Sequence, residues 1–164
     1  MGPFIPPFLG DVYSLNNFKI GILGSITFLG SALLGVCLGR VGDKWTKAGA
    51  VSVSMILCCI STGMLISFSN FFVLAAASFL MGASYITWSL LGAVIGSIAP
   101  EGSRARWISI PQTASMLASF LAPYLGGALY GISPYNPFLV AIATTPLLAI
   151  LVLTKQFSQG TEKD

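Results

Sequence analysis

The chain has 164 residues, of which 55% are hydrophobic and only 8% are charged, whereas a soluble domain carries about 25% charged residues. So few charges cannot cover a water-soluble surface, and a formal net charge of +3 is too small to indicate a nucleic-acid partner. Histidine is absent and all three cysteines lie in apolar runs, which argues against a zinc or haem site. The composition therefore predicts an all-α integral membrane protein in a lipid bilayer, with no metal and no other cofactor.

The first apolar stretch, residues 4–9, is too short to cross a bilayer, because the hydrocarbon core requires roughly 20 apolar residues in a helix. We interpret it as the last turn of a helix that this chain does not contain. The first predicted spanning helix follows at residues 20–38. Its apolar run is continuous rather than alternating, which favours a helix over a strand of a membrane barrel.

A short charged loop, residues 39–47, separates this helix from the next and reads Gly-Arg-Val-Gly-Asp-Lys-Trp-Thr-Lys. Its two glycines permit close backbone packing. Asp43 is the only acid in the loop, so it can pair with a neighbouring cation or with a helix N-terminus. Two readings stay open from the residues alone: a loop whose cations only set the topology, or a loop with a role in function.

Three more spanning helices are predicted at residues 48–68, 71–99 and 107–131. No charged residue occurs between Lys47 and Glu101, as expected where an unpaired charge costs about 2.5–3.5 kcal/mol at the bilayer centre. The helix at 71–99 is long enough to be tilted. A Ser-Phe-Ser-Asn turn precedes it, and Pro-Glu-Gly-Ser ends it and begins a second charged loop near residues 101–106.

The fifth predicted helix, residues 137–153, is short and follows a Ser-Pro-Tyr-Asn-Pro break. Residues 156–164 form a polar tail that we expect to be disordered. Five helices preceded by an apolar stub suggest a six-helix unit without its first helix. We treat residues 1–164 as one partial domain.

The basic residues predict the orientation, because Lys and Arg gather on the cytoplasmic side of membrane proteins. If all five helices span, seven basic residues lie on one side and one lies on the other. The loops near 40–47 and 101–106 and the C-terminus are therefore predicted to be cytoplasmic. The seven are Arg40, Lys44, Lys47, Arg104, Arg106, Lys155 and Lys163, and the exception is Lys19.

Two of the predicted helices carry a face of small and polar residues. Such a face can line an aqueous cavity or form a packing seam between helices. In the helix at 71–99 the face contains Ser78, Gly82, Tyr85, Ser89, Gly92 and Gly96, with Trp88 beside it. In the helix at 107–131 it contains Gln112, Ser115, Ser119, Pro123, Gly126 and Tyr130. Gln112 is the most polar of these side chains and lies next to Pro111, where the helix can bend.

Three Gly-x-x-x-Gly pairs, at positions 35/39, 92/96 and 127/131, fit close contact between helices. No predicted helix contains an ionisable residue of the Asp, Glu, His, Lys or Arg type in mid-membrane. Because such residues form the usual proton relays, we expect no proton relay in this segment. A solute would meet hydroxyl, amide and aromatic groups instead.

The loop at 39–47 resembles the cytoplasmic loop signature of the major facilitator superfamily, which reads Gly, three residues, Asp, Arg or Lys, any residue, Gly and then basic residues. Thr46 replaces the second glycine and Ala48 the last basic residue. Residues 100–106 resemble the family's second basic loop, and residues 121–127 resemble its Pro-x-x-Gly-Gly stretch. Ala122 stands where the antiporter form has glycine, so antiport is not inferred. The matching positions of the first loop are Gly39, Asp43, Lys44 and Lys47.

The resemblance covers essentially the whole chain and implies half of this family's fold. Because a short polar tail follows the last helix, we favour the carboxyl-terminal six-helix half, lacking its first helix; an amino-terminal fragment truncated at both ends is the alternative. The first loop, together with Arg104, would then act as a conformational latch. The helix at 71–99 would line the cavity, which makes Tyr85, Trp88 and Ser89 candidate substrate-facing residues. Gln112 of the helix at 107–131 is a further candidate because it is the most polar side chain of the later segments.

These observations predict part of a secondary transporter of the cell membrane that moves a small solute by alternating access, with the missing half of the same transporter as its partner. The alternative is a small membrane scaffold or subunit that assembles through glycine-rich helix faces. A membrane-embedded lipid enzyme would need a nucleophile, an acid–base pair or a metal site near an interface, and the sequence offers no such constellation. We therefore predict that the chain is not an enzyme.

Overall fold

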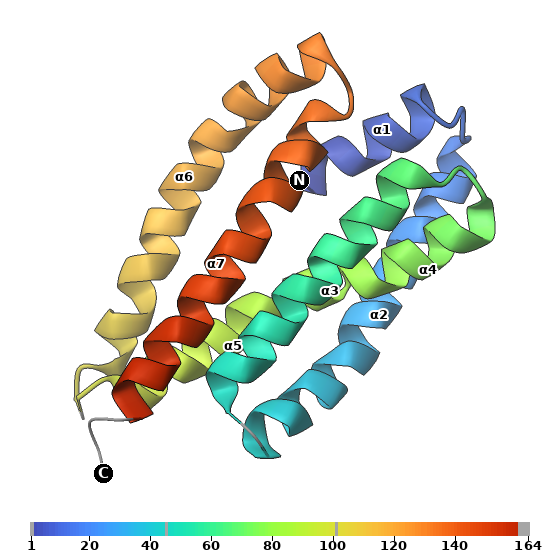
Figure 1. Cartoon of the computed structure of the whole chain (residues 1–164). Helices are drawn as coiled ribbons and strands as arrows, with labels where there is room; N and C mark the ends of the chain where they lie inside the picture. The colour runs from blue at the N-terminus through green and yellow to red at the C-terminus, as the bar shows by residue number, and fades with distance from the viewer. Residues whose placement is uncertain (1, 45, 101, 161–164) are drawn as a thin grey trace.

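The computed structural model describes residues 2–44, 46–100 and 102–160, and every regular element in those ranges is a helix (Figure 1). The prediction of an all-α fold is thus confirmed. The elements in chain order are the 3-10 helix η1 (Gly2–Phe4) and the α-helices α1 (Ile5–Asp11), α2 (Asn17–Lys44), α3 (Lys47–Ser67), α4 (Phe71–Met81), α5 (Ala83–Ile98), α6 (Arg104–Ile132) and α7 (Asn136–Gly160).

The helices form a polytopic membrane bundle. Within the described ranges, α2, α3, the continuous pair α4–α5 and α6 are each long and apolar enough to cross a bilayer. The apolar part of α7 that is described, Asn136–Ile150, is shorter. α3 lies centrally in this bundle, in contact with α2, α4, α5 and α7.

Helix bounds differ from the sequence expectation mainly at the charged ends. α2 continues through Lys44, so most of the predicted loop at 39–47 is helical, in line with the good helix propensity of Arg and Lys. The side chain of Thr46 caps α3 by accepting a 3.0 Å hydrogen bond from the backbone N–H of Gly49. α7 extends to Gly160, which includes part of the predicted polar tail, whereas residues 161–164 lie outside the described residues.

The predicted helix at 71–99 is interrupted at Gly82, which separates α4 from α5. The Gly82 N–H bonds the carbonyl of Phe79, three residues back, so the helix tightens locally at this point. An added Cβ at Gly82 would lie 2.6 Å from the carbonyl oxygen of Thr27 and would also meet the backbone nitrogen of Ser31. An added Cβ at Gly30 would likewise meet the backbone of Phe79. The backbones of α2 and α4–α5 therefore touch where these two glycines cross.

One glycine in each of two predicted Gly-x-x-x-Gly pairs lies against a neighbouring helix, whereas an added Cβ at its partner, Gly39 or Gly92, would meet nothing within 4 Å. A Cβ at Gly35 would lie 3.5 Å from the side chain of Ile86, and one at Gly96 would lie 3.5 Å from Ile108. These are ordinary van der Waals distances between neighbouring helices. Gly35 and Gly96 thus lie at contacts between helices of the same chain, and both positions have room for a Cβ.

The hydrophobic core is concentrated at the end of the bundle where α1 lies. Phe8 of α1 is fully buried, and its ring centroid lies 4.7 Å from that of Phe138 and 5.3 Å from that of Tyr135. The apolar stub of the sequence is therefore a short helix that packs on α7 and closes this end of the core. The core cluster comprises Phe8, Leu9, Leu23, Leu65, Leu74, Ala77 and Phe138.

Buried hydroxyl groups join α3 to its neighbours. Ser61 Oγ donates a 2.7 Å hydrogen bond to the backbone carbonyl of Ala77 in α4. Ser54 Oγ and Thr87 Oγ1 of α5 are 2.9 Å apart and share a hydrogen bond. Both serines are fully buried and cannot reach water, so these bonds satisfy their hydroxyl groups.

We predict that Ser61→Ala lowers the free energy of unfolding by about 0.6 kcal/mol, the mean value for an interhelical hydrogen bond in a membrane bundle. The measurement is reversible unfolding by SDS in mixed micelles. Ser25→Ala is the matched control, because Ser25 is exposed and its hydroxyl bonds only Gly21 of its own helix. Equal stability of the two variants would contradict a stabilising role for the hydrogen bond between Ser61 and Ala77.

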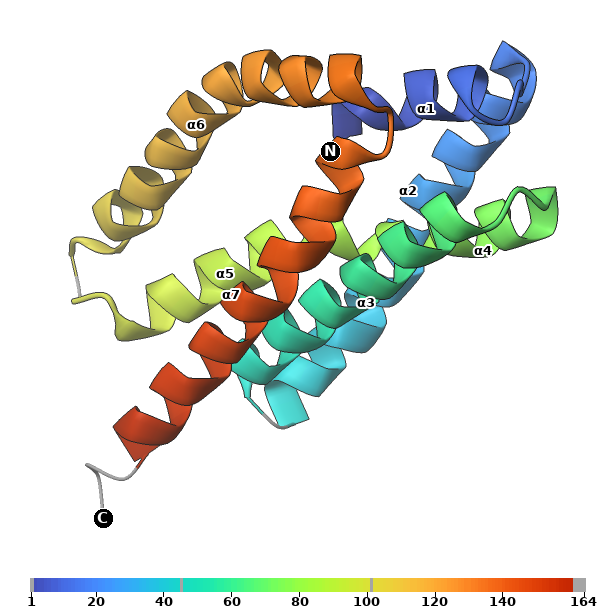
Figure 2. The same ribbon diagram turned by 45° about the horizontal axis from the view of Figure 1, so that its top comes forward.

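α6 is held more loosely than the other long helices. None of its described residues is buried, and it contacts the bundle mainly through α5 and α7. Figure 2 shows it bowed away from the other helices. Pro111 and Pro123 lie inside it, and each removes a backbone hydrogen bond and favours a bend.

Candidate functional site

A cavity of about 510 Å³ lies between α5 and α6, a size in the range of small-molecule sites. Gln112, Ser115 and Ser119 contribute to its α6 wall, because spacings of three and four residues place them on one helix face. Trp88 and Ser89 contribute to the α5 wall. Leu91, Ile95 and Met116 are among its apolar lining residues.

The chemistry of this cavity is polar but uncharged. The amide of Gln112 can donate and accept hydrogen bonds, the serine hydroxyls can do both, and the indole of Trp88 can donate. No residue of its described lining is acidic or basic. The cavity is thus suited to a solute with hydroxyl, carbonyl or amide groups.

A second cavity, of about 530 Å³, lies on the other side of Trp88 and is bounded by α1, α2, α3 and α4–α5. It is largely apolar, with Leu9, Leu23 and Phe28 among its lining residues. Tyr85 also lines it, and its ring centroid is 5.6 Å from that of Phe28. Trp88 is the residue that the two cavities share.

All four candidate cavity residues of the sequence analysis therefore line a cavity. Trp88, Ser89 and Gln112 meet in the first, and Tyr85 lies in the second together with Trp88. Their contact with a solute stays a prediction. The second cavity was not expected, because its lining comes from six elements, η1 and α1 to α5, and only Tyr85 and Trp88 carried a sequence signal.

A hydrogen bond connects α6 to α1 at one end of the bundle. The hydroxyl of Tyr130 donates to Oδ2 of Asp11 at 2.8 Å, and the Phe4 ring stacks on Tyr130 with centroids 5.9 Å apart. Gly126 leaves room for that ring, since an added Cβ would lie 2.5 Å from Phe4 Cε2. Asp11 was missed by the sequence analysis; its signal was an acid on the side that otherwise carries only Lys19.

The predicted latch residues lie elsewhere. Asp43 and Lys44 are the last two residues of α2 and are exposed, and Arg104 is the first residue of α6. Asp43 forms no ion pair with another side chain that the structure describes, and the side chain of Lys47 lies outside that part. Gly39 is half-buried near the same end of α2. The latch therefore stays a prediction.

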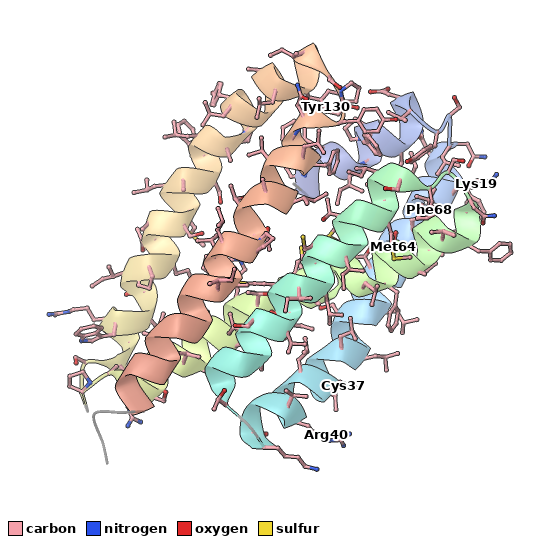
Figure 3. All side chains as sticks on the ribbon, viewed as in Figure 1. Lys19, Cys37, Arg40, Met64, Phe68 and Tyr130 are labelled. Carbon is pink, nitrogen blue, oxygen red and sulfur yellow. The ribbon has the colours of Figure 1, made fainter. Side chains whose placement is uncertain are left out.

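The two ends of the bundle differ in charge. Figure 3 shows Arg40 at the end opposite to Lys19 and Tyr130. Lys44 follows Arg40 by one helical turn on α2, so it lies at the same end.

Over the part of the chain that the structure describes, no three His, Cys, Asp or Glu side chains gather as a metal site would require.

Comparison with known proteins identifies relatives among bacterial resistance proteins. The chain is 26% identical to the class G tetracycline resistance protein of Vibrio anguillarum, over 85% of this chain and 36% of that protein. It is 22% identical to the class H tetracycline resistance protein of Pasteurella multocida, over 98% of this chain and 40% of that protein. It is 21% identical to the class B tetracycline resistance protein of Escherichia coli, over 92% of this chain and 38% of that protein. The chain thus spans about two fifths of the length of these relatives.

The comparison with protein families covers nearly the whole chain. A sequence profile of the Major Facilitator Superfamily matches residues 1–162, nearly the full length of the chain. The all-α bundle of apolar helices agrees with half of this fold. The protein is an integral, multi-pass membrane protein, and it belongs to the Major Facilitator Superfamily.

Proposed function

We propose that this chain is part of a carrier that moves a small solute across the cell membrane by alternating access, with the α5–α6 cavity as part of the solute site. The observation that carries the proposal is this cavity of about 510 Å³ with an uncharged polar lining, in a member of the Major Facilitator Superfamily. Alternating access requires two bundles that rock about a central site. The proposed partner is the rest of the same transporter, since the chain spans about two fifths of its relatives.

The proposed orientation places the α2–α3 connection and the start of α6 in the cytoplasm. Arg40 and Lys44 lie near the C-terminal end of α2, and Arg104 and Arg106 lie at the start of α6. An excess of basic residues marks the cytoplasmic side. On this assignment, Tyr130 and Asp11 lie at the outer end of the bundle.

The test is uptake by membrane vesicles from cells that express the chain within its complete transporter. Tetracycline is the first solute to assay, because the relatives are named for resistance to it. Gln112→Ala should raise the KM about fivefold, the loss of one hydrogen bond worth about 1 kcal/mol. Thr113→Ala is the control, because Thr113 neighbours Gln112 and does not line the cavity. Equal transport by wild type and Gln112→Ala, for every solute that the vesicles carry, would overturn the site.

A second prediction concerns Asp43, the acid of the first loop, to which the family resemblance assigns the latch role. Asp43→Asn should lower the transport rate about threefold, because an amide forms weaker contacts with cationic donors than a carboxylate does. The amount of transporter in the membrane, measured by immunoblot, should not change, since Asp43 is exposed at a helix end. Unchanged uptake at equal amounts of protein would refute the latch role.

A further inference from the structure

The two cavities that meet at Trp88 differ in polarity, and the cavity on the α6 side is the more polar of the two. On the α6 side, Gln112, Ser115 and Ser119 present hydrogen-bonding groups. On the α2 side, the lining is mostly apolar and aromatic, and its hydroxyls, those of Thr27 and Ser84, already donate to nearby backbone carbonyls. A ligand that occupied both cavities would therefore have one polar end and one apolar end.

Three aromatic rings gather around this junction. Phe28 of α2 and Tyr85 of α5 have centroids 5.6 Å apart with an interplanar angle of 34°. Trp88 follows Tyr85 by three residues on α5, so both rings lie on the same side of that helix. All three side chains are more than half exposed, which leaves their surfaces open to a ligand. Aromatic rings in this arrangement favour an aromatic partner, because paired rings gain energy beyond simple area burial.

The absence of charged residues from the described linings narrows the class of ligand further. Neither cavity is lined by a described Asp, Glu, Lys or Arg side chain. A fully charged ligand would lose its hydration here without an ionic partner, at a large cost in free energy. A lipid acyl chain fits the apolar cavity but leaves the amide of Gln112 and the nearby hydroxyls without partners.

We propose that the two cavities form one binding site for an uncharged, amphipathic aromatic molecule, whose ring system packs on Phe28, Tyr85 and Trp88 while its hydroxyl or carbonyl groups bond Gln112 and the serines of α6. The proposal rests on the proposed transport function and specifies the class of solute. Trp88 determines specificity because it contacts both ends of the ligand.

The experiment is isothermal titration calorimetry on the complete transporter that contains this chain, in lipid nanodiscs, with three matched probes. 2-Naphthyl β-D-glucoside is uncharged, aromatic and polar at one end. 2-Naphthyl sulfate keeps the ring but carries a fixed charge, and octyl β-D-glucoside keeps the sugar but replaces the ring with an alkyl chain. The naphthyl glucoside should bind at least tenfold more tightly than either of the others.

Variants separate the two ends of the site. Trp88→Leu should weaken binding of the naphthyl glucoside about tenfold, and Gln112→Leu about fivefold. Trp107→Leu is the matched control, because Trp107 is about equally exposed but lines neither cavity. Helix content by circular dichroism should be equal in all variants, which excludes misfolding as the cause of weaker binding.

Three results would overturn this class of ligand: tight binding of the sulfate, equal binding of the octyl glucoside, or no heat of binding for the naphthyl glucoside up to millimolar concentration. An effect of Trp107→Leu as large as that of Trp88→Leu would also overturn it. None of these results touches the transport proposal, which fails separately if vesicles that contain the complete transporter carry no solute; unchanged uptake by Gln112→Ala would overturn only the proposed solute site.

Discussion

Gly82→Ala is expected to lower the free energy of unfolding by about 1–3 kcal/mol, the cost of forcing an extra carbon into a filled space. The added Cβ would meet backbone atoms of α2, among them the carbonyl oxygen of Thr27 at 2.6 Å. Backbone atoms cannot rotate away as the end of a flexible side chain can. The crossing of α2 and α4–α5 must therefore open, and the packing on both sides of it loosens.

The measurement is SDS-induced unfolding in mixed micelles, followed by circular dichroism. Gly63→Ala is the matched control, because it also lies inside a spanning helix and an added Cβ there meets nothing within 4 Å. Alanine favours the helix over glycine by about 0.5–1 kcal/mol, so the control should be neutral or slightly stabilised. Loss of stability in the control to the same extent would show that the crossing is not the cause.

Gly30→Ala should behave as Gly82→Ala does, since its added Cβ would lie 2.8 Å from the backbone carbonyl carbon of Phe79. Combining the two substitutions should cost less than the sum of the single losses, because one opened crossing relieves both clashes. A fully additive double variant would indicate two independent sites. This non-additivity is therefore a direct test of the shared crossing.

Local patterns in the sequence were sufficient to predict the helices and the polar face of the cavity. Long charge-free runs identify spanning helices because charge in hydrocarbon is costly. Gln112 and Ser89 stood out because the helical period places polar residues on one face. Both kinds of signal arise within a single helix, which is why one sequence was enough to reveal them.

Features that join distant segments were not predicted. The hydrogen bond from Tyr130 to Asp11 links residues 119 positions apart, and nothing near either residue indicates the other. The crossing of Gly30 and Gly82 is a similar case, because glycine in a membrane helix has several uses. The second cavity likewise depends on how α1 and α2 approach α5, so its lining cannot be read from any one segment.

Tyr130→Phe is expected to release the end of α6 from α1, because the variant keeps the ring but cannot donate to Asp11. Hydrogen bonds to charged groups contribute about 1.5–3 kcal/mol, and the lower end applies because Asp11 is exposed. Such a loss corresponds to roughly tenfold faster local opening. Hydrogen exchange of the backbone amides around residues 126–132, measured by mass spectrometry in nanodiscs, should therefore accelerate about tenfold.

Tyr124→Phe is the matched control for this prediction. Tyr124 lies on the same helix, is more exposed, and its ring packs edge-on against Phe120, while its hydroxyl makes no hydrogen bond within the described ranges. Exchange near residue 124 should be unchanged in that variant. Equal exchange in Tyr130→Phe and wild type would mean that Phe4 and Gly126 hold α6 without the hydrogen bond. Faster exchange confined to Tyr130→Phe would instead identify Tyr130 and Asp11 as a releasable contact between α6 and α1. A helix that borders a solute site must break such a contact in order to move.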